Sequence, residues 1–374
     1  MTDRKGFDLR QLLSLLAVLL LTPALRLFPS GAVRLAGRAA WLSPLLALPA
    51  LGGYLWFLCR FLSHRREGEG LSELLGRAAG EKLARPVQLL TALWLLFYSG
   101  FVLRSGADRF ITTVYPHSGP AFFVISMGLL GAVAALGAER SIVRAGRLVL
   151  PLLYGTLALA LLAALLALKK ENLLPVTGRD LLPAAAGALP VLDVVSAVMV
   201  LGAFFVWPLP KTAEPLRPGL RWLAAACILL CLLAAAILGS FGAELTDLLT
   251  QPFFYLVRNL VFFRNLERVE AFVVTLWVFP DFLMFSALLF AARRCLDPAL
   301  SLPQPDPAAP LSLRGGRWVT PLSALPAILC GCLLAPGAES LAFFSERLIP
   351  GLNLGFAFIL LPGLYLLGRV KKRI

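Results

Sequence analysis

Long apolar runs separated by short polar connections make up most of the chain. A helix needs about 20 mostly apolar residues to cross a bilayer, and ten runs come close to that length or exceed it. We expect ten membrane-spanning helices, at residues 11–29, 41–61, 87–107, 120–138, 148–168, 188–208, 221–241, 271–292, 320–336 and 350–368. The sequence lacks the alternating segments typical of membrane β-strands, so it predicts one all-α polytopic membrane domain over residues 1–374.

The eighth span follows directly on a cluster of charged residues. The cluster contains Glu267, Arg268 and Glu270, and the span contains Pro280 and Asp281. A proline interrupts a helix, and a carboxylate inside a bilayer is tolerated only where it faces protein or water. We therefore expect a helix break at the Pro-Asp pair and protein around it. The charged cluster is expected to be a structural ion-pair network at the outer mouth or an ion-attracting vestibule.

Two further spans are interrupted by residues that disfavour a helix. Span one contains Thr22-Pro23, which predicts either a proline kink or an unwound segment facing a binding site. Span six contains Asp193 and Ser196, although Asp193 could instead mark the outer membrane interface. The two breaks lie five spans apart. Broken helices in corresponding positions of two halves predict a five-plus-five inverted repeat, LeuT-like, with broken helices one and six.

Other polar residues lie at the ends or within the apolar runs. Arg26 follows the span-one break by one turn and either extends to the interface or lines a cavity. In span three, Tyr98 and Ser99 form a small polar break. Arg104 and Asp108 have the i, i+4 spacing of an ion pair. This pair is expected at the outer boundary of the membrane or as a gate to a central cavity.

The connection between spans two and three, residues 62–86, is long and polar, but its leucines have helical spacing. Such a pattern predicts an amphipathic helix on the cytoplasmic membrane face.

Composition supports the same class of protein. Hydrophobic residues make up 59% of the chain and charged residues 15%, which excludes a soluble domain of this length. The formal net charge of +14 lies in the connections without an aromatic-basic motif, so it does not indicate nucleic-acid binding. Lys and Arg favour the termini and the even-numbered connections by roughly two to one, which predicts that both termini are cytoplasmic.

Residues for catalysis or metal binding are scarce. The chain has two His and six Cys, and the spacing of Cys330 and Cys332 is too short for a metal site without a His partner. No phosphate-binding loop, Ser/His/Asp arrangement or zinc-protease motif is present. We therefore expect no enzyme activity, no cofactor and no metal.

Short motifs along the chain point to one family. They are a basic start with Gln11 before span one, Trp41-Leu-Ser at span two, Arg104 to Asp108 in span three, Glu139-Arg140 with Arg144 and Pro151, and Glu267-Arg268-Val-Glu270 followed by Trp277. Together they resemble the spore germination permeases, the integral membrane B subunits of nutrient germinant receptors. That family is related to the amino acid–polyamine–organocation transporters.

The resemblance implies a subunit that binds a small germinant, commonly an amino acid, and acts with a receptor A subunit and a lipoprotein C subunit to trigger ion release. The pocket should lie between spans one, three, six and eight, where half-helix N-termini offer positive charge to a carboxylate and a counter-charge serves an ammonium group. The residues expected to line it are Thr22, Pro23, Tyr98, Ser99, Ser196, Met199, Trp277 and Asp281.

Some alternatives stay open at this point. Asp281 could contact a ligand amine or a permeating cation, or it could only pair with Ser or Arg on a neighbouring span. The chain could be a sensor or nutrient-gated channel subunit in the inner membrane of a spore-forming bacterium. It could also be a freestanding secondary amino-acid transporter driven by a proton or sodium gradient.

Overall fold

The computed structural model describes residues 7–66, 69–113, 115, 118–136, 139–205, 216–249, 251–259, 275–301, 319–334 and 337–374, and these form helices and short connections with no strand among them. The predicted charged cluster Glu267, Arg268 and Glu270 lies outside the described residues. The α-helices are α1 (Leu9–Arg26), α2 (Phe28–Ala36), α3 (Ser43–Leu62), α4 (Leu71–Ala79), α5 (Glu81–Thr113), α6 (Pro120–Ala135), α7 (Glu139–Leu166), α8 (Leu181–Ala186), α9 (Ala188–Ala203), α10 (Leu216–Leu248), α11 (Pro252–Asn259), α14 (Val278–Ala299), α15 (Val319–Leu333), α16 (Ala338–Phe343), α17 (Ile349–Leu354) and α18 (Leu361–Val370).

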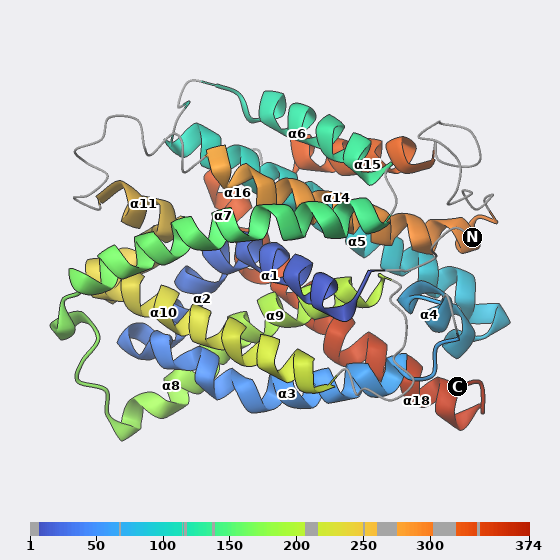
Figure 1. Ribbon diagram of the computed structural model, residues 1–374, viewed down its shortest axis with the longest axis horizontal. Helices are drawn as coiled ribbons and strands as arrows, with labels where there is room; N and C mark the ends of the chain where they lie inside the picture. The colour runs from blue at the N-terminus through green and yellow to red at the C-terminus, as the bar shows by residue number, and fades with distance from the viewer. Residues whose placement is uncertain are drawn as a thin grey trace.

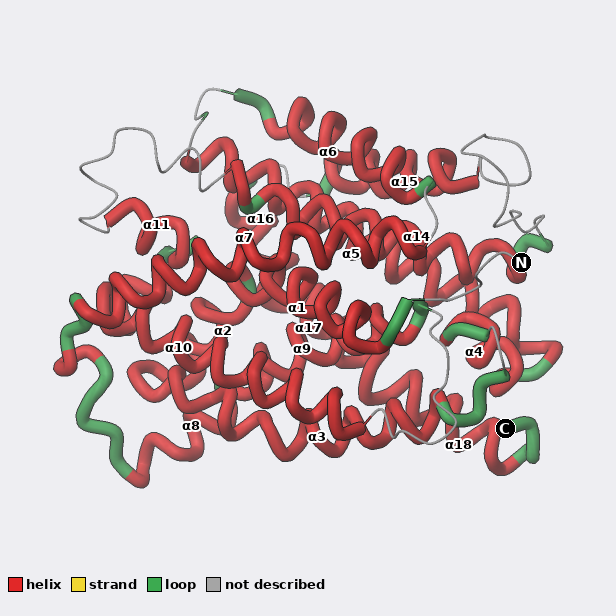
Figure 2. The backbone as a smooth tube through the Cα atoms, viewed as in Figure 1, coloured by secondary structure: helices red, strands yellow, loops and turns green. Residues whose placement is uncertain are grey.

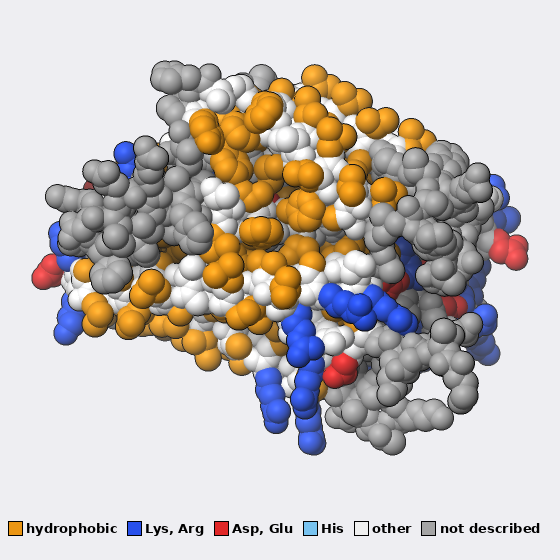
Figure 3. All heavy atoms as spheres, turned by 45° about the horizontal axis from the view of Figure 1, so that its top comes forward, with side chains coloured by type: hydrophobic (Ala, Val, Ile, Leu, Met, Phe, Trp, Pro, Cys, Tyr) orange, Lys and Arg blue, Asp and Glu red, His pale blue; other side chains and the backbone are white. Residues whose placement is uncertain are grey.

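Most helices run along the long axis of the molecule, and both chain ends and α4 lie at the same end of it (Figure 1). Seven helical segments within the described residues are long and apolar enough to cross a membrane. Helices α6 and α15 lie along one side of the bundle and α3 along the other, with loops mainly at the two ends (Figure 2). On the face in Figure 3, hydrophobic side chains fill the middle, and charged ones lie towards the ends and one lower edge. The protein is an all-α integral membrane protein.

Helix α5 is the centre of the packing. Helix α14 packs along it, and α15, α4 and α6 also lie against it. The charges on α14 lie towards its two ends, while its middle residues, such as Met284 and Leu288, are buried. Helix α14 is thus an interior helix whose surroundings are protein, as expected for a span that carries Asp281.

Span one is broken, but at a different residue from the predicted one. Helix α1 runs through Thr22 and Pro23 and ends at Arg26, and α2 begins at Phe28 after a single turn residue. The proline removes only one helical donor, and the tight packing of the flanking residues holds the helix together there. An unwound segment at Thr22-Pro23 was therefore the wrong alternative.

The break in span six is also displaced. Helix α9 is continuous through Asp193 and Ser196, and the interruption falls earlier, at Gly187 between α8 and α9. Asp193 is 1% exposed, so it is inside the bundle and does not mark the interface. Its carboxyl accepts a hydrogen bond from Asn353 and so does not compete for backbone donors of its own helix.

The break in span eight falls at Trp277, three residues before the predicted Pro280-Asp281 pair, which is itself helical. Residues 275 and 276 are helical, Trp277 is a turn, and α14 starts at Val278. Pro280 and Asp281 therefore lie in the first turn of α14, where a proline costs no hydrogen bond. The predicted helix in the connection after span two is α4, whose leucines are buried against the bundle.

Candidate functional site

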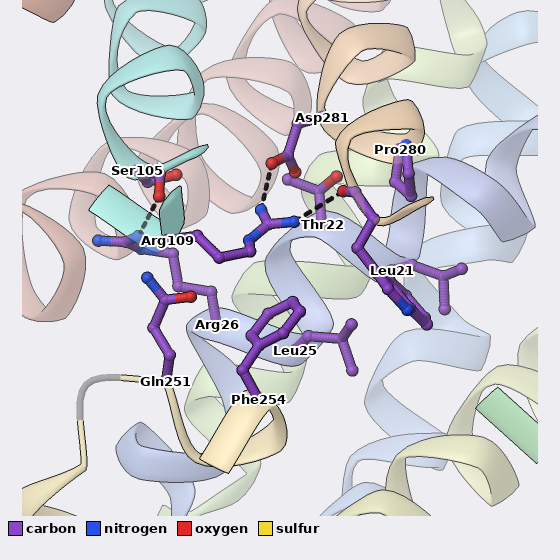
Figure 4. A pocket seen from close by; sticks show the side chains of 11 residues that line it. Leu21, Thr22, Leu25, Arg26, Ser105, Arg109, Gln251, Phe254, Pro280 and Asp281 are labelled. Atoms are coloured by element: carbon purple, nitrogen blue, oxygen red, sulfur yellow. Dashed lines mark hydrogen bonds and ion pairs between the residues drawn. The ribbon is translucent and has the colours of Figure 1, made fainter. Parts of the chain in front are cut away.

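A buried ion pair joins α5 to α14. Arg109 contacts Asp281 through Nη2 and Oδ2, and its Nη1 donates a hydrogen bond of 2.7 Å to the carbonyl oxygen of Trp277. Arg109 is 8% exposed and Asp281 is 1% exposed. Figure 4 shows the guanidinium between the carboxylate and the turn that begins α14. Of the alternatives for Asp281, internal pairing with an arginine on a neighbouring span is the one that the structure contains.

The local structure explains this arrangement. Asp281 lies in the first turn of α14, where the unpaired backbone N–H groups give the helix end a partial positive charge. The carboxylate is therefore stabilised by the helix as well as by Arg109. The Trp277 carbonyl at the N-cap of α14 accepts the hydrogen bond from Arg109, so the guanidinium contacts both the cap and the first turn of this helix.

A second arginine lies beside this pair. Arg26, in the last turn of α1, donates from Nη1 to the carbonyl oxygen of Ser105 at 3.0 Å. Its Cζ lies 5.3 Å from the centroid of the Phe101 ring, and the Arg109 Cζ lies 4.8 Å from that of Phe254. Arg26 lines a cavity, which was one of its two predicted roles.

The cavity lies between α1, α5, α11 and α14 (Figure 4). Its lining is Leu21, Thr22, Leu25, Arg26, Ser105, Arg109, Gln251, Phe254, Trp277, Pro280 and Asp281. Two arginines thus face one carboxylate, which leaves an excess of positive charge. The volume is ≈ 10 Å³, close to the least that holds one water. A cavity of this volume is too small for an organic ligand in the arrangement of helices described here.

Of the residues predicted to bind a ligand, three line this cavity: Thr22, Trp277 and Asp281. Pro23 is buried on α1 but does not line it. Four others are buried elsewhere: Tyr98, Ser99, Ser196 and Met199. The hydroxyls of Ser99 and Ser196 donate to carbonyls three residues earlier in their own helices, so they are satisfied locally.

The predicted pair in span three is present at the edge of the cavity. The Arg104 Nη1 and the Asp108 Oδ1 lie 3.7 Å apart. Gln251, which lines the cavity, donates to the Asp108 Oδ2 at 3.2 Å. The pair therefore connects α5 to Gln251, the residue that precedes α11.

Sequence reasoning missed Arg109 and Gln251 as site residues. The sequence does contain a signal for Arg109. Arg104 and Arg109 lie near a single carboxylate, Asp108, so one of the two arginines needs an acidic partner from another helix. Gln251 had no signal, because only the fold brings the start of α11 to α5.

A second ion-pair network closes the end of the bundle that contains both chain termini. Arg294, near the end of α14, contacts Glu139 on α7 and lies 3.2 Å from Glu73 on α4. The Ser72 hydroxyl also donates to the Arg294 carbonyl oxygen. One arginine thus holds three helices together at the opposite end of α14 from Asp281.

Comparison with known proteins agrees with the motifs and the fold. The family model described as spore germination protein matches residues 7–307, most of the chain. A search of curated proteins finds no match. Among solved structures, a Na⁺-coupled sialic acid symporter in a substrate-bound outward-open state is similar, with a TM-score of 0.58 and 15% identity over 95% of this chain and 78% of the symporter. That likeness bears on the fold, which is LeuT-like as predicted. The chain belongs to the spore germination protein family of membrane permeases.

Proposed function

We propose that the chain is the membrane subunit of a germinant receptor and binds a small nutrient, an amino acid, in the cavity between α1, α5, α11 and α14. One observation carries the proposal. A chain of the spore germination family buries the Arg109–Asp281 pair beside a second arginine, Arg26, in a cavity at a helix break. Buried charges at a helix break are how transporters of this fold class bind charged ligands. These features support a permease or receptor rather than an enzyme.

The charges fit the two ends of an amino acid. An ammonium group can replace Arg109 as the partner of Asp281, and a carboxylate can pair with Arg109 and Arg26. Both members of the buried pair then keep a partner, so opening the cavity leaves no uncompensated charge. Phe254, Trp277 and Leu25 surround these groups and would contact an apolar side chain.

Ligand binding at this position would act on the packing of the bundle. Arg109 ties α5 to the start of α14, while Arg294 ties the end of α14 to α4 and α7. A ligand that pairs with Asp281 displaces Arg109 from this carboxylate. The contact between α5 and the start of α14 is then lost, so α14 can move relative to α5. Our proposal is that this movement is passed to the receptor A and C subunits and leads to ion release. The protein would lie in the inner membrane with both termini cytoplasmic.

A second candidate is a freestanding amino-acid transporter driven by a proton or sodium gradient. The similarity of the fold to a sodium-coupled symporter favours it. Vesicles that contain this chain alone would accumulate labelled amino acid if it is a transporter. A receptor subunit would not accumulate it and would instead co-purify with A and C subunits from spores.

Thermal shift of the purified full-length protein against amino acids, nucleosides and sugars tests the ligand class. A ligand that binds only the folded state raises the unfolding temperature. We expect an amino acid to do so in the wild type and in Asp247→Asn, whose altered carboxylate is on the surface. The shift should be lost in Asp281→Asn. An amino-acid shift of the same size in Asp281→Asn, or no shift with any compound in the wild type, contradicts the proposal.

A further inference from the structure

A second group of polar side chains is buried away from the cavity. It consists of Asp193 on α9, Asn353 on α17, and Trp94 and Tyr98 on α5. The Asn353 Nδ2 donates to the Asp193 Oδ1 at 2.8 Å, and the Trp94 Nε1 donates to the Asn353 Oδ1 at 3.0 Å. None of these four residues lines the cavity that contains Asp281.

The orientation of the Asn353 amide follows from chemistry. The indole N–H of Trp94 can only donate, so the amide oxygen of Asn353 faces Trp94. The amide NH₂ must then face Asp193. The Trp94 ring also stacks on Phe356, with centroids 4.1 Å apart, which fixes the ring in place. The surroundings of the carboxyl group are therefore a hydrogen-bond donor and aromatic rings.

Asp193 has no cationic partner among the described residues. Its Oδ1 accepts from Asn353, while its Oδ2 is buried without a hydrogen-bond partner in the part of the chain that the structure describes. Within the part of the chain that the structure describes, the titratable side chain beside it is the phenol of Tyr98. The elements packed against α9 carry Arg10 and Arg26 on α1, Arg34 on α2, Tyr54, Cys59 and Arg60 on α3, and Asp281, Arg293, Arg294, Cys295 and Asp297 on α14. None of the charged ones forms an ion pair with Asp193.

We infer that Asp193 is a proton-binding site, separate from the ligand cavity, in which Oδ2 gains and releases a proton. An ionised carboxylate that is 1% exposed and has no cation beside it is strongly disfavoured, so it takes up a proton. A metal ion fits poorly, because it needs several oxygen ligands and the Asn353 amide presents NH₂ to this carboxyl group. No cluster of three or more His, Cys, Asp or Glu occurs within the described residues.

The site is joined to the ligand cavity by aromatic rings. The rings of Tyr98 and Phe101 stack with centroids 6.4 Å apart, and the Arg26 guanidinium lies over Phe101. Tyr98, which lies beside Asp193, is thus connected through Phe101 to an arginine that lines the cavity. The proton site itself does not depend on the germinant proposal, because its evidence lies in a different set of residues.

Infrared spectra of the purified full-length protein test this inference without any ligand. A protonated carboxyl group gives a carbonyl band that an ionised one lacks. We expect a band that is present in the wild type and in Asp247→Asn, is absent in Asp193→Asn, and loses intensity as the pH rises. A band that is missing at every pH, or one that does not change with pH, overturns the inference. Loss of the band on addition of NaCl at fixed pH would also overturn it, because it would indicate a metal-cation site.

Trp94 provides a second measurement on folded protein. Its N–H is hydrogen-bonded to the residue that contacts Asp193, so its fluorescence should change with the same pH midpoint as the infrared band. The change should disappear in Trp94→Phe, which keeps Asp193 intact. If Asp193→Asn does not fold, the fluorescence of the wild type and of Trp94→Phe still tests the inference. Wild-type fluorescence that does not change with pH contradicts a proton site at Asp193.

Discussion

Gly106 on α5 lies directly against the carboxylate of Asp281 on α14. A Cβ at Gly106 would lie 3.0 Å from the Asp281 Oδ2 and 3.0 Å from the Cε of Met127. The absence of a side chain at this position is therefore what lets the carboxylate fit beside α5 and reach Arg109. The two helices depend on this glycine both for packing and for the geometry of the cavity.

Replacing Gly106 by Val should destabilise the protein. The branched side chain forces Asp281 or Met127 to move, and such overpacking costs about 1–3 kcal/mol in the free energy of unfolding. Gly155→Val is the matched control, because nothing lies within 4 Å of a Cβ at that exposed position in α7. We expect a change of less than about 0.5 kcal/mol for the control, measured by denaturant unfolding in detergent. Equal stability of the two variants would contradict the close packing.

Much of the fold could be predicted from the sequence, because hydrophobic length has a direct physical meaning in a bilayer. Helices α6 and α15 begin and end within three residues of two expected spans, whereas α14 begins and ends seven residues after its expected span. The positions of the helix breaks in spans one and six were wrong, because a proline or an aspartate inside a helix is tolerated when tertiary packing satisfies it. The chain does break at Gly187 and at Leu27, and Pro29 in the first turn of α2 follows the second of these breaks.

The site residues that could be predicted from the sequence are polar side chains within otherwise apolar runs. Asp281 and Thr22 stood out as polar groups in apolar runs, and both line the cavity. Tyr98 and Ser196 stood out equally but lie elsewhere, because the rotation of each helix decides which face meets the cavity. Asn353, which completes the hydrogen-bond group around Asp193, could not be paired with it without the fold.

Replacing only one member of the Arg109–Asp281 pair should lower the free energy of unfolding more than replacing both, because the remaining charge is left buried and unpaired. Asp281→Leu alone leaves a buried guanidinium without its carboxylate and Arg109→Met alone leaves a buried carboxylate without its guanidinium, and removing one partner of a buried pair costs about 3–5 kcal/mol. The double variant Arg109→Met with Asp281→Leu should recover much of this loss, because no buried charge is left unpaired. Unfolding free energies of the two single variants and the double variant give the coupling.

A surface ion pair provides the control for this comparison of single and double variants. Arg34 and Asp247 lie 2.8 Å apart, but both side chains are 41% exposed. Asp247→Asn should therefore change stability by less than about 1 kcal/mol. Additive losses in the Arg109 and Asp281 variants, with no recovery in the double variant, would show that the two residues do not act as a pair.

Removing the Arg294 side chain should loosen α4. In Arg294→Gln the ion pairs to Glu73 and Glu139 are lost, while the buried leucines of α4 remain. We expect faster hydrogen exchange in residues 71–79 than in the wild type, measured by mass spectrometry, because local opening becomes easier. The control is Arg60→Gln at an exposed position of α3, which should leave exchange in this segment unchanged. Unchanged exchange in Arg294→Gln would mean that α4 is held by its apolar contacts alone.

The distribution of Lys and Arg predicts which end of the bundle faces the cytoplasm. Both chain termini and α4 lie at one end, and the loop that contains Glu171 lies at the other (Figure 1). With the six native cysteines replaced, Ser63→Cys and Glu171→Cys each place one thiol at an exposed position at one end. Because positive loops stay inside, a membrane-impermeant maleimide should label Glu171→Cys in intact cells and Ser63→Cys only after the membrane is opened. The reverse pattern would invert the topology and place the Arg104–Asp108 pair on the cytoplasmic side.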